Sequence, residues 1–272
     1  MNFVKMHGLG NDFIIAEGDG LDFTPEDAVR LCSRRTGIGA DGIMFAAKSN
    51  RADAFMRLFN SDGSMAEMCG NGIRCFAKYL YESGIAKKPV INIDTPAGIK
   101  TAVLTLEGDE VTAVRIDMGV PMFERKDVPM QGDGICSLER IQVGGREFVC
   151  SALNTGVPHL VVFEEGLSEE EICFFGPLLE RHELFPAKIN VNFAQVRPDG
   201  SISVRTWERG CGRTLACGTG SCACVAAAAY AGLAPRDNII HLALGQLHIT
   251  WAEDGHIFME GPAEVSFRGS ID

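Results

Sequence analysis

The sequence predicts an α+β protein of two similar domains, in each of which the strands enclose a helix. Three observations lead to this fold class. The tetrapeptide Cys-Gly-x-Gly occurs twice, at Cys69 and at Cys217. Strand and helix signals precede each cysteine in the same order. A helix that is apolar around much of its surface follows each motif, which favours enclosure of that helix by the strands of its own half.

The chain looks like a duplicated unit. Cys69 and Cys217 lie 148 positions apart (217 minus 69) in a chain of 272 residues. At that offset "IMFA" aligns with "VNFA", and after a slip of two residues "GNDFIIAEG" aligns with "GVPHLVVFEEG". Identity is weak, so the repeated order of elements is needed as a second argument. We expect one domain at 1–117, to which a strand at 263–272 returns, and a second domain at 118–262, with a cleft between them.

Short apolar runs predict the strands of both halves. They lie at 12–16, 42–47 and 54–59 in the first half, and at 159–163, 189–196 and 201–207 in the second. Further strands and hairpins are expected within 90–117 and 237–267. Two turns are predicted, at Pro198-Asp199-Gly200 and at Glu253-Asp254-Gly255.

One outer helix is expected in each half. The first begins at Thr24, which can cap it, with a proline in its first turn. The second begins at Ser168, and Glu171 three residues later completes a capping-box pattern. Gly176-Pro177 predicts the end of that second helix, because proline lacks the N–H that an interior helical residue donates.

The central helices follow the two cysteine motifs. In the first, apolar residues recur at helical spacing and Gly84 can end the helix; they are Ile73, Phe76, Ala77, Leu80 and Tyr81. In the second, 221–231 is rich in alanine, with Gly232 and Pro235 beyond it. The uncharged run 214–235 is interpreted as a buried helix, because its small residues are only weakly apolar. No membrane partner is therefore expected.

Composition excludes several classes of protein. The chain is 46% hydrophobic and 22% charged, which is ordinary for a protein with a core. The formal net charge of −11 argues against general nucleic-acid binding but permits a small zwitterionic substrate. The stretch "MNFVKMHGLGNDF" lacks the apolar run of a signal peptide, which predicts a cytoplasmic protein.

The ten cysteines predict reduced thiols and no metal site. No Cys-x-x-Cys pair occurs, and Cys222 and Cys224 would point to different faces of a helix. Most of the thiols are expected to act as small buried hydrophobes. The same packing interpretation applies to four cysteines near the motifs: Cys75, Cys211, Cys222 and Cys224.

A paired Cys-Gly-x-Gly suits one kind of chemistry. A cysteine just before a helix feels the positive end of the helix dipole, which favours its thiolate. The Gly-x-Gly backbone leaves N–H groups that can bind a carboxylate. One such motif could be a nucleophile or a redox thiol. Two of them suit stereoinversion next to a carboxylate, where one thiolate removes the α-proton and the opposite thiol delivers another.

Five motifs stand out along the chain: "HGLGNDF", "GIGADG", "NSDGSMAEMCGNGIRC", "GVPH" and "WERGCGRTLACGTGSCA". Through these motifs the chain resembles the diaminopimelate epimerase family from residue 1 to about residue 262. The resemblance implies a cofactor-independent isomerase that interconverts L,L- and meso-diaminopimelate, on the route to lysine and peptidoglycan. It also implies an α+β fold of two pseudo-symmetric domains, each a mixed β-sheet or barrel wrapped around a central helix, and a cytosolic homodimer.

The resemblance also implies site residues. Cys69 and Cys217 are the acid/base pair, His159 tunes Cys69, and Glu208 tunes Cys217. The implied substrate contacts are Asn11, Asn60, Gly70, Asn71, Asn190, Glu208, Arg209, Gly218 and Thr219. The residue types fit this assignment, because asparagines offer neutral donors and acceptors and an arginine can bind a distal carboxylate in a bidentate manner.

Two departures from the family pattern leave the exact substrate open. Val157 stands where many members have Asn, and Gly42 stands where some have Gln; Asn154 could compensate. A related racemase of the histidine or proline type, using the same two cysteines, is the alternative enzyme. A non-catalytic binding protein on this scaffold is a third hypothesis, against which the presence of both thiols argues. A zinc-binding or redox module is the fourth.

Overall fold

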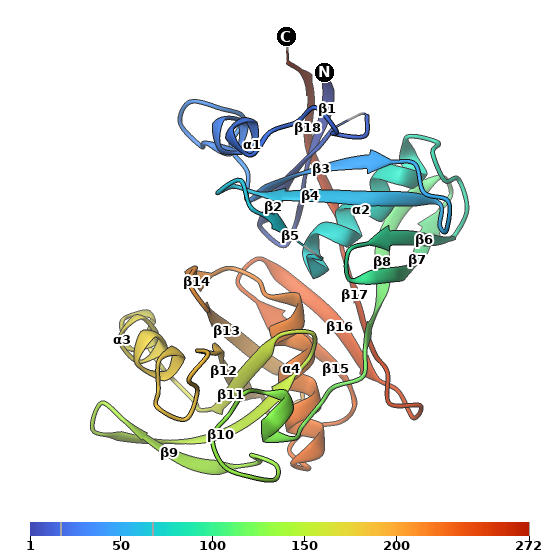
Figure 1. The fold of residues 1–272 in the computed structure, drawn as a ribbon. Helices are drawn as coiled ribbons and strands as arrows, with labels where there is room; N and C mark the ends of the chain where they lie inside the picture. The colour runs from blue at the N-terminus through green and yellow to red at the C-terminus, as the bar shows by residue number, and fades with distance from the viewer. Residues whose placement is uncertain (17, 67, 272) are drawn as a thin grey trace. The chain divides into compact units, whose positions relative to one another are not determined.

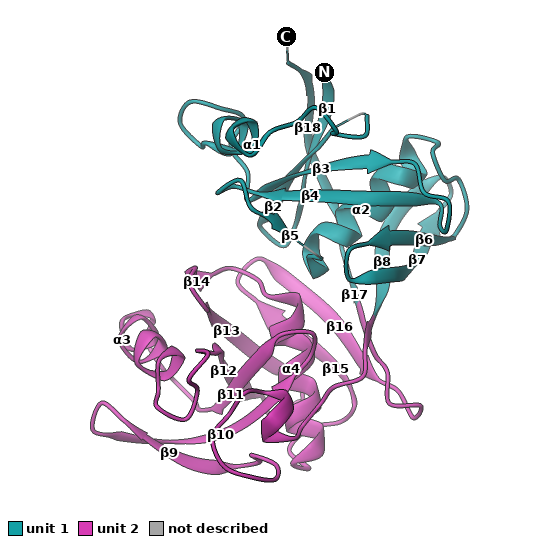
Figure 2. Ribbon diagram, viewed as in Figure 1, with its two compact units in different colours: residues 1–117, 260–272 teal, residues 118–259 magenta. Residues whose placement is uncertain are grey.

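The computed structural model describes residues 1–16, 18–66 and 68–271 and divides into two compact units (Figure 2). Unit 1 comprises Met1–Asp117 and Glu260–Asp272, and unit 2 comprises Met118–Met259. Glu67 of the first cysteine motif and Asp272 of the predicted returning strand lie outside the described residues. Within the described ranges, no helix is long and apolar enough to cross a membrane.

Unit 1 surrounds a central helix with strands (Figure 1). Its elements are β1 (Asn2–Gly8), β2 (Asn11–Ala16), α1 (Pro25–Cys32), β3 (Gly42–Ala47), β4 (Ala54–Asn60), β5 (Met65–Ala66), α2 (Gly70–Glu82), β6 (Val90–Thr95), β7 (Gly98–Glu107) and β18 (Glu264–Ser270). β18 pairs with β1 in antiparallel register, so the end of the chain returns to the start. β8 (Glu110–Gly119) and β17 (Ile257–Gly261) contain the two points where the chain passes from one unit to the other.

Unit 2 has the same plan. Its elements are a 3-10 turn η1 (Arg125–Asp127), β9 (Glu139–Val143), β10 (Arg146–Asn154), β11 (Pro158–Phe163), α3 (Glu169–Glu180), β12 (Asn190–Val196), β13 (Ile202–Glu208), β14 (Gly212–Thr214), α4 (Gly218–Tyr230), β15 (Asp237–Leu242) and β16 (Gly245–Trp251).

Strand pairing repeats between the units. β2 pairs parallel with β3, which pairs antiparallel with β4, which pairs parallel with β6. β11, β12, β13 and β15 repeat that sequence of pairings. The predicted fold class is therefore confirmed, and the predicted strands form within a residue or two of their expected bounds.

The outer helices begin where the sequence predicts. The hydroxyls of Thr24 and Ser168 each accept the N–H three residues later, and both helix starts form complete capping boxes. The predicted end at Gly176-Pro177 is wrong, because α3 continues through Pro177 to Glu180. Tertiary packing overrides the lost hydrogen bond: Phe175 and Leu179 lie in the buried core of unit 2 on either side of the proline.

The central helices α2 and α4 are almost wholly buried. Every residue of α2 from Gly70 to Tyr81 is buried, and α4 is buried from Gly220 to Ala228. α2 packs on β1, β2, β3 and β7, whereas α4 packs on β10–β13, β15 and β16. Gly84 and Gly232 adopt the positive φ expected of residues that follow a helix end.

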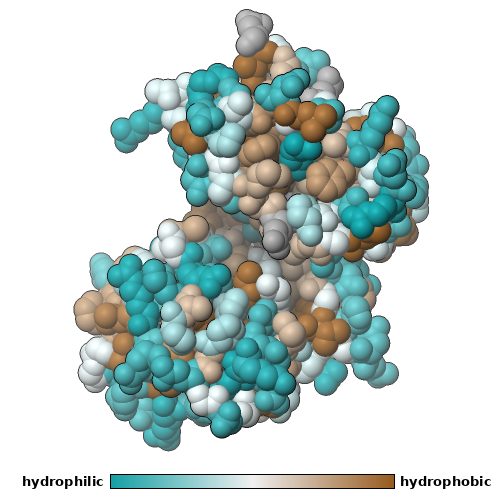
Figure 3. All heavy atoms as spheres, in the orientation of Figure 1, coloured by the Kyte–Doolittle hydropathy of each residue, from teal (hydrophilic) through white to brown (hydrophobic). Residues whose placement is uncertain are grey.

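The main apolar clusters lie inside the units and consist of buried residues. On the face shown in Figure 3, hydrophobic residues are scattered among hydrophilic ones.

Candidate active site

Both motif cysteines cap a central helix. Cys69 is the N-cap of α2, with extended φ and ψ of −136° and 120°, and Cys217 is the N-cap of α4, with −126° and 112°. The N–H groups of Gly72 and Gly220 each donate to the cysteine sulfur at 3.4 Å. Each sulfur therefore sits at the positive end of a helix, which favours negative charge on it.

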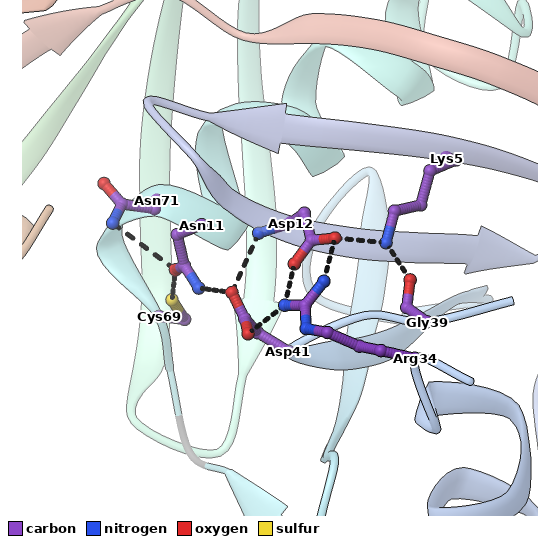
Figure 4. Close-up of polar contacts among 8 residues, drawn as sticks. All are labelled: Lys5, Asn11, Asp12, Arg34, Gly39, Asp41, Cys69 and Asn71. Atoms are coloured by element: carbon purple, nitrogen blue, oxygen red, sulfur yellow. Dashed lines mark hydrogen bonds and ion pairs between the residues drawn. The ribbon is translucent and has the colours of Figure 1, made fainter. Parts of the chain in front are cut away.

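Asn11 contacts the sulfur of unit 1. The Asn11 side-chain oxygen lies 3.5 Å from Cys69 Sγ and 3.4 Å from Asn71 Nδ2 (Figure 4). Asn71 lies in the first turn of α2, and its oxygen accepts from Arg74 Nη1 at 3.1 Å. Because the guanidinium only donates, Asn71 must turn its amide nitrogen toward Asn11. The predicted site residues Asn11, Cys69 and Asn71 thus form one cluster.

A charged network continues from Asn11 away from the sulfur (Figure 4). Asn11 Nδ2 donates to Asp41 at 2.6 Å, and Arg34 Nη2 bridges Asp41 and Asp12 at 2.7 Å to each. Lys5, which is almost fully buried, donates to Asp12 from the other side. Burial raises the pKa of Asp12, but the hydrogen bonds from Arg34 and Lys5 outweigh it and lower that pKa to about 2.

A directed chain of hydrogen bonds reaches the sulfur of unit 2. Asn192 Nδ2 contacts the Leu160 carbonyl at 3.3 Å and His159 Nδ1 at 3.0 Å. A carbonyl only accepts, so this atom is the amide nitrogen, and His159 Nδ1 must be an acceptor. Burial, and secondarily the charge of Arg209, lower the pKa of His159 to about 3, so the ring is neutral.

The proton of the neutral His159 ring is consequently on Nε2. That nitrogen lies 3.0 Å from the Thr219 hydroxyl oxygen, which lies 3.4 Å from Cys217 Sγ. Since Thr219 accepts from the histidine, its own hydroxyl proton is directed to the sulfur. The structure therefore brings His159, Cys217 and Thr219 together within unit 2.

Three other predicted residues meet at the ends of β12 and β13. Asn190 begins β12 opposite His159; its amide nitrogen donates to the Pro158 carbonyl at 2.9 Å. Its oxygen accepts the backbone N–H of Arg209 at 2.9 Å. Glu208 is the last residue of β13, directly before Arg209. The guanidinium of Arg209 reaches the Ala187 carbonyl at 3.1 Å.

Two further predicted residues, Asn60 and Asn154, form hydrogen bonds within their own units. Asn60 ends β4 and donates from its side chain to Ser64 at 2.9 Å across a turn. The Asn154 side-chain nitrogen donates to the Asp127 carbonyl at 2.8 Å. Its buried side-chain oxygen accepts no hydrogen bond from the described part of the chain. Val157 is partly exposed in the turn before β11, and Gly42 begins β3 opposite Asn60.

Sequence reasoning missed Asp41 and Asn192. Asp41 lies inside the quoted "GIGADG" motif, and Asn192 is a fully buried polar residue between the apolar residues Val191 and Phe193. A polar residue at a buried strand position is the signal that could have identified Asn192.

Most of the other thiols are buried. Burial raises the pKa of Cys75 to about 12 and that of Cys32 and Cys136 to about 11. The packing interpretation of Cys211 is wrong, because this residue is exposed in the turn after β13, where a backbone turn leaves the side chain outside the core. Among the described residues, no group of three or more His, Cys, Asp or Glu could hold a metal ion.

The fold is that of several solved racemases and epimerases. A probable proline racemase from Agrobacterium radiobacter superposes with a TM-score of 0.71 at 19% identity, covering 100% of this chain and 92% of that one. A hydroxyproline epimerase from Agrobacterium vitis gives 0.69 at 19% identity, covering 100% and 90%. A phenazine biosynthesis protein of the PhzF family from Bacillus anthracis gives 0.69 at 18% identity, covering 100% and 99%. At such identities these structures establish the fold class alone.

Sequence similarity is more specific. The family model described as diaminopimelate epimerase matches residues 3–124 and 151–266. The diaminopimelate epimerase of Desulfitobacterium hafniense is 46% identical over 279 residues, covering 100% of this chain and 98% of that protein. That of Moorella thermoacetica is 46% identical over 277 residues, covering 100% and 99%. The chain belongs to the diaminopimelate epimerase family, which confirms the resemblance.

Proposed function

We propose that this protein is a two-base epimerase that interconverts L,L- and meso-diaminopimelate without a cofactor, in lysine and peptidoglycan precursor synthesis. One observation carries the proposal: each of the two pseudo-symmetric units presents a cysteine as the N-cap of its buried central helix. The family membership supplies the substrate.

The proposed reaction needs one sulfur for each face of the substrate α-carbon. One thiolate removes the α-proton, and the second sulfur, as a thiol, gives its proton to the opposite face. The negative charge that develops on the carboxylate is stabilised by the N–H groups at the helix starts, at Gly70 and Asn71 and at Gly218 and Thr219. Each sulfur ends the reaction in the protonation state from which its partner began.

The remaining roles follow the family pattern. His159 is proposed to tune Cys69, and through Thr219 it also directs a hydroxyl to Cys217. Glu208 is proposed to tune Cys217. Asn11, Asn60 and Asn190 are proposed to bind the substrate, and Arg209 to bind its distal carboxylate, with Asn154 as a further candidate.

Early deuterium incorporation tests the proposal. In heavy water, the product of the first turnovers should carry deuterium at the inverted carbon, while unreacted substrate keeps hydrogen. This follows because the delivering thiol holds a solvent-derived proton. A one-base enzyme would return part of the original hydrogen. Product that retains much of that hydrogen contradicts the two-base assignment.

A substrate panel tests the alternative of a histidine- or proline-type racemase, which Val157 and Gly42 keep open. The panel contains L,L-diaminopimelate, histidine, proline and hydroxyproline, and proton exchange at Cα is followed by NMR. Exchange confined to diaminopimelate supports the proposal. Exchange confined to another amino acid would overturn the assignment of diaminopimelate as the substrate but keep the assigned reaction type.

We further propose a cytoplasmic homodimer, which is supported by the family pattern. Light scattering after size-exclusion chromatography should give about twice the chain mass of 29.4 kDa. A mass equal to that of one chain contradicts the dimer.

A further inference from the structure

We propose that Asp41 is a positioning residue that holds the Asn11 amide with its oxygen, rather than its NH₂ group, toward Cys69. The inference rests on the proposed function for its catalytic meaning, but the geometry stands on hydrogen bonds within unit 1. Neither Asp41 nor Arg34 is among the residues that the family resemblance implied.

The direction of the Asn11 amide follows from charge. Asp41 carries a carboxylate, which only accepts hydrogen bonds, so the Asn11 atom 2.6 Å from it must be the NH₂ nitrogen. Charge-assisted bonds of this kind are stronger than neutral ones. The weaker 3.4 Å contact from Asn71 to the Asn11 oxygen favours the same orientation. The Asn11 oxygen is thereby turned to the sulfur.

The Asp41 carboxylate is itself held from three directions. Arg34 donates to one oxygen at 2.7 Å, and the backbone N–H of Asp12 donates to the other at 3.1 Å, beside Asn11. Arg34 also forms two hydrogen bonds with Asp12, which Lys5 contacts from the interior. The charged groups around this part of the site are therefore Lys5, Asp12, Arg34 and Asp41, together with Arg74 beyond Asn71.

An oxygen facing the sulfur favours the thiol. A carbonyl-type oxygen accepts the S–H proton but repels a thiolate, whereas an NH₂ group would stabilise the thiolate. Asp41 thus counteracts the helix dipole and the Gly72 N–H at Cys69 and shifts the equilibrium of this sulfur toward the thiol when no substrate is bound. The Thr219 hydroxyl has the opposite effect on Cys217, because it donates to the sulfur.

Asp41→Asn tests the inference. Arg34 only donates, so it will bind the oxygen of the new amide, and the NH₂ group will face Asn11. The Asn11 amide should then rotate so that its oxygen accepts from this NH₂ group and its own NH₂ group faces Cys69. We expect Cys69 to react with iodoacetamide about threefold faster at pH 7, equivalent to about half a pKa unit. Peptide mapping measures Cys69 separately, with Cys217 in the same molecule as the reference. No substrate is present, so failure of the proposed function would leave this result intact.

Asp12→Asn is the matched control. It removes one negative charge from the same network and one partner of Arg34, but its side chain does not bind Asn11. It should raise the rate at which Cys69 reacts with iodoacetamide by clearly less than threefold. Equal acceleration in both variants would mean that only the lost charge acts, and would overturn the proposal. An unchanged Cys69 rate in folded Asp41→Asn would overturn it as well.

Asp41→Glu separates positioning from charge and serves if Asp41→Asn does not fold. The charge stays, but the longer side chain no longer meets Asn11 in the same geometry. We expect an increase of about twofold in the Cys69 rate and a matching downward shift of its alkylation pH profile. A rate equal to that of the unmodified protein would count against positioning.

Discussion

The starts of the two central helices have the same backbone but different neighbours. Cys69 and Cys217 cap their helices with similar dihedral angles and accept the same N–H three residues later. In unit 1 the strand residues that face Gly72 are apolar: a Cβ added at Gly72 would lie 3.3 Å from Phe13 and 3.5 Å from the Met44 sulfur.

Unit 2 has polar residues at the corresponding positions. His159 corresponds to Phe13, because each is paired with the first residue of the neighbouring parallel strand, β12 or β3. Asn192 corresponds to Met44, because each lies two residues further along that strand. A Cβ added at Gly220 would come 2.2 Å from the Asn192 oxygen. The helix cap therefore sets where each sulfur lies, whereas side chains from the strands and loops around it decide whether the sulfur meets a donor or an acceptor.

Removing either cysteine sulfur should abolish the epimerase activity, which is proposed to need one sulfur from each unit. Cys69→Ala and Cys217→Ala should each fold and lose epimerisation by a factor of about 10³ or more, because acid or base catalysis is lost on one face. Serine should also fail, since a hydroxyl is a far weaker base at neutral pH. Steady-state rates measure the loss, and Cys211→Ala, which removes an exposed thiol, should remain active. Substantial turnover by either alanine variant would refute the paired role.

Acid should destabilise unit 2 through His159. The folded pKa of about 3 is below the unfolded value of about 6.5, so the unfolded chain binds the proton first. This contribution to stability is present above pH 6.5 and is lost as the pH falls toward 3, at about 1.4 kcal/mol per pH unit. By pH 4.5 the loss should reach about 2–3 kcal/mol.

Urea unfolding at pH 7 and pH 4.5 measures this loss. His159→Gln has no ring to protonate, so it should lose less stability between the two pH values than the unmodified protein. The carboxylates contribute equally to both proteins and cancel in the difference. An identical acid-induced loss in both would contradict the role of His159, whose counterpart Phe13 cannot titrate.

Asn192→Met would make unit 2 resemble unit 1 at one position. It leaves the buried His159 Nδ1 without its donor, which should cost about 1–3 kcal/mol of unfolding free energy. Without Asn192 the His159 tautomer is no longer fixed, so the Thr219 hydroxyl proton is no longer directed to Cys217. The kcat should therefore fall about tenfold, equivalent to about 1.4 kcal/mol. Met44→Leu is the control in unit 1, because it conserves volume and should cost less than about 1.5 kcal/mol. Full activity of Asn192→Met would show that the hydrogen-bond chain is dispensable.

The smallest expected difference concerns the outer helices. Thr24→Ala and Ser168→Ala should each lower the unfolding free energy by about 1 kcal/mol, because each removes one side of a capping box. Urea denaturation compares the two. A large gap between them would mean that the outer helices contribute unequally, contrary to their matched caps.

Much of the plan was readable from the sequence. Local signals such as the Thr24 and Ser168 caps, the two Cys-Gly-x-Gly turns and the terminal glycines depend on residues within one helical turn, so they predict element starts and ends without tertiary information. The in-phase repeat and the quoted motifs then predicted the fold class and the family. Several residues close to the two sulfurs lie inside those motifs, namely Asn11, Asn71, His159 and Thr219.

Tertiary structure decided what local signals could not. Pro177 remains helical because Phe175 and Leu179 are anchored in a core that only distant strands complete. Asp41 meets Asn11 from another strand end, thirty residues along the chain, and Asn192 meets His159 across a parallel strand pair. Hydrogen-bond direction depends on which acceptor or donor lies opposite in space. The sequence alone therefore determined where the two thiols sit on their helices, and only the packed strands determined which polar atom each thiol faces.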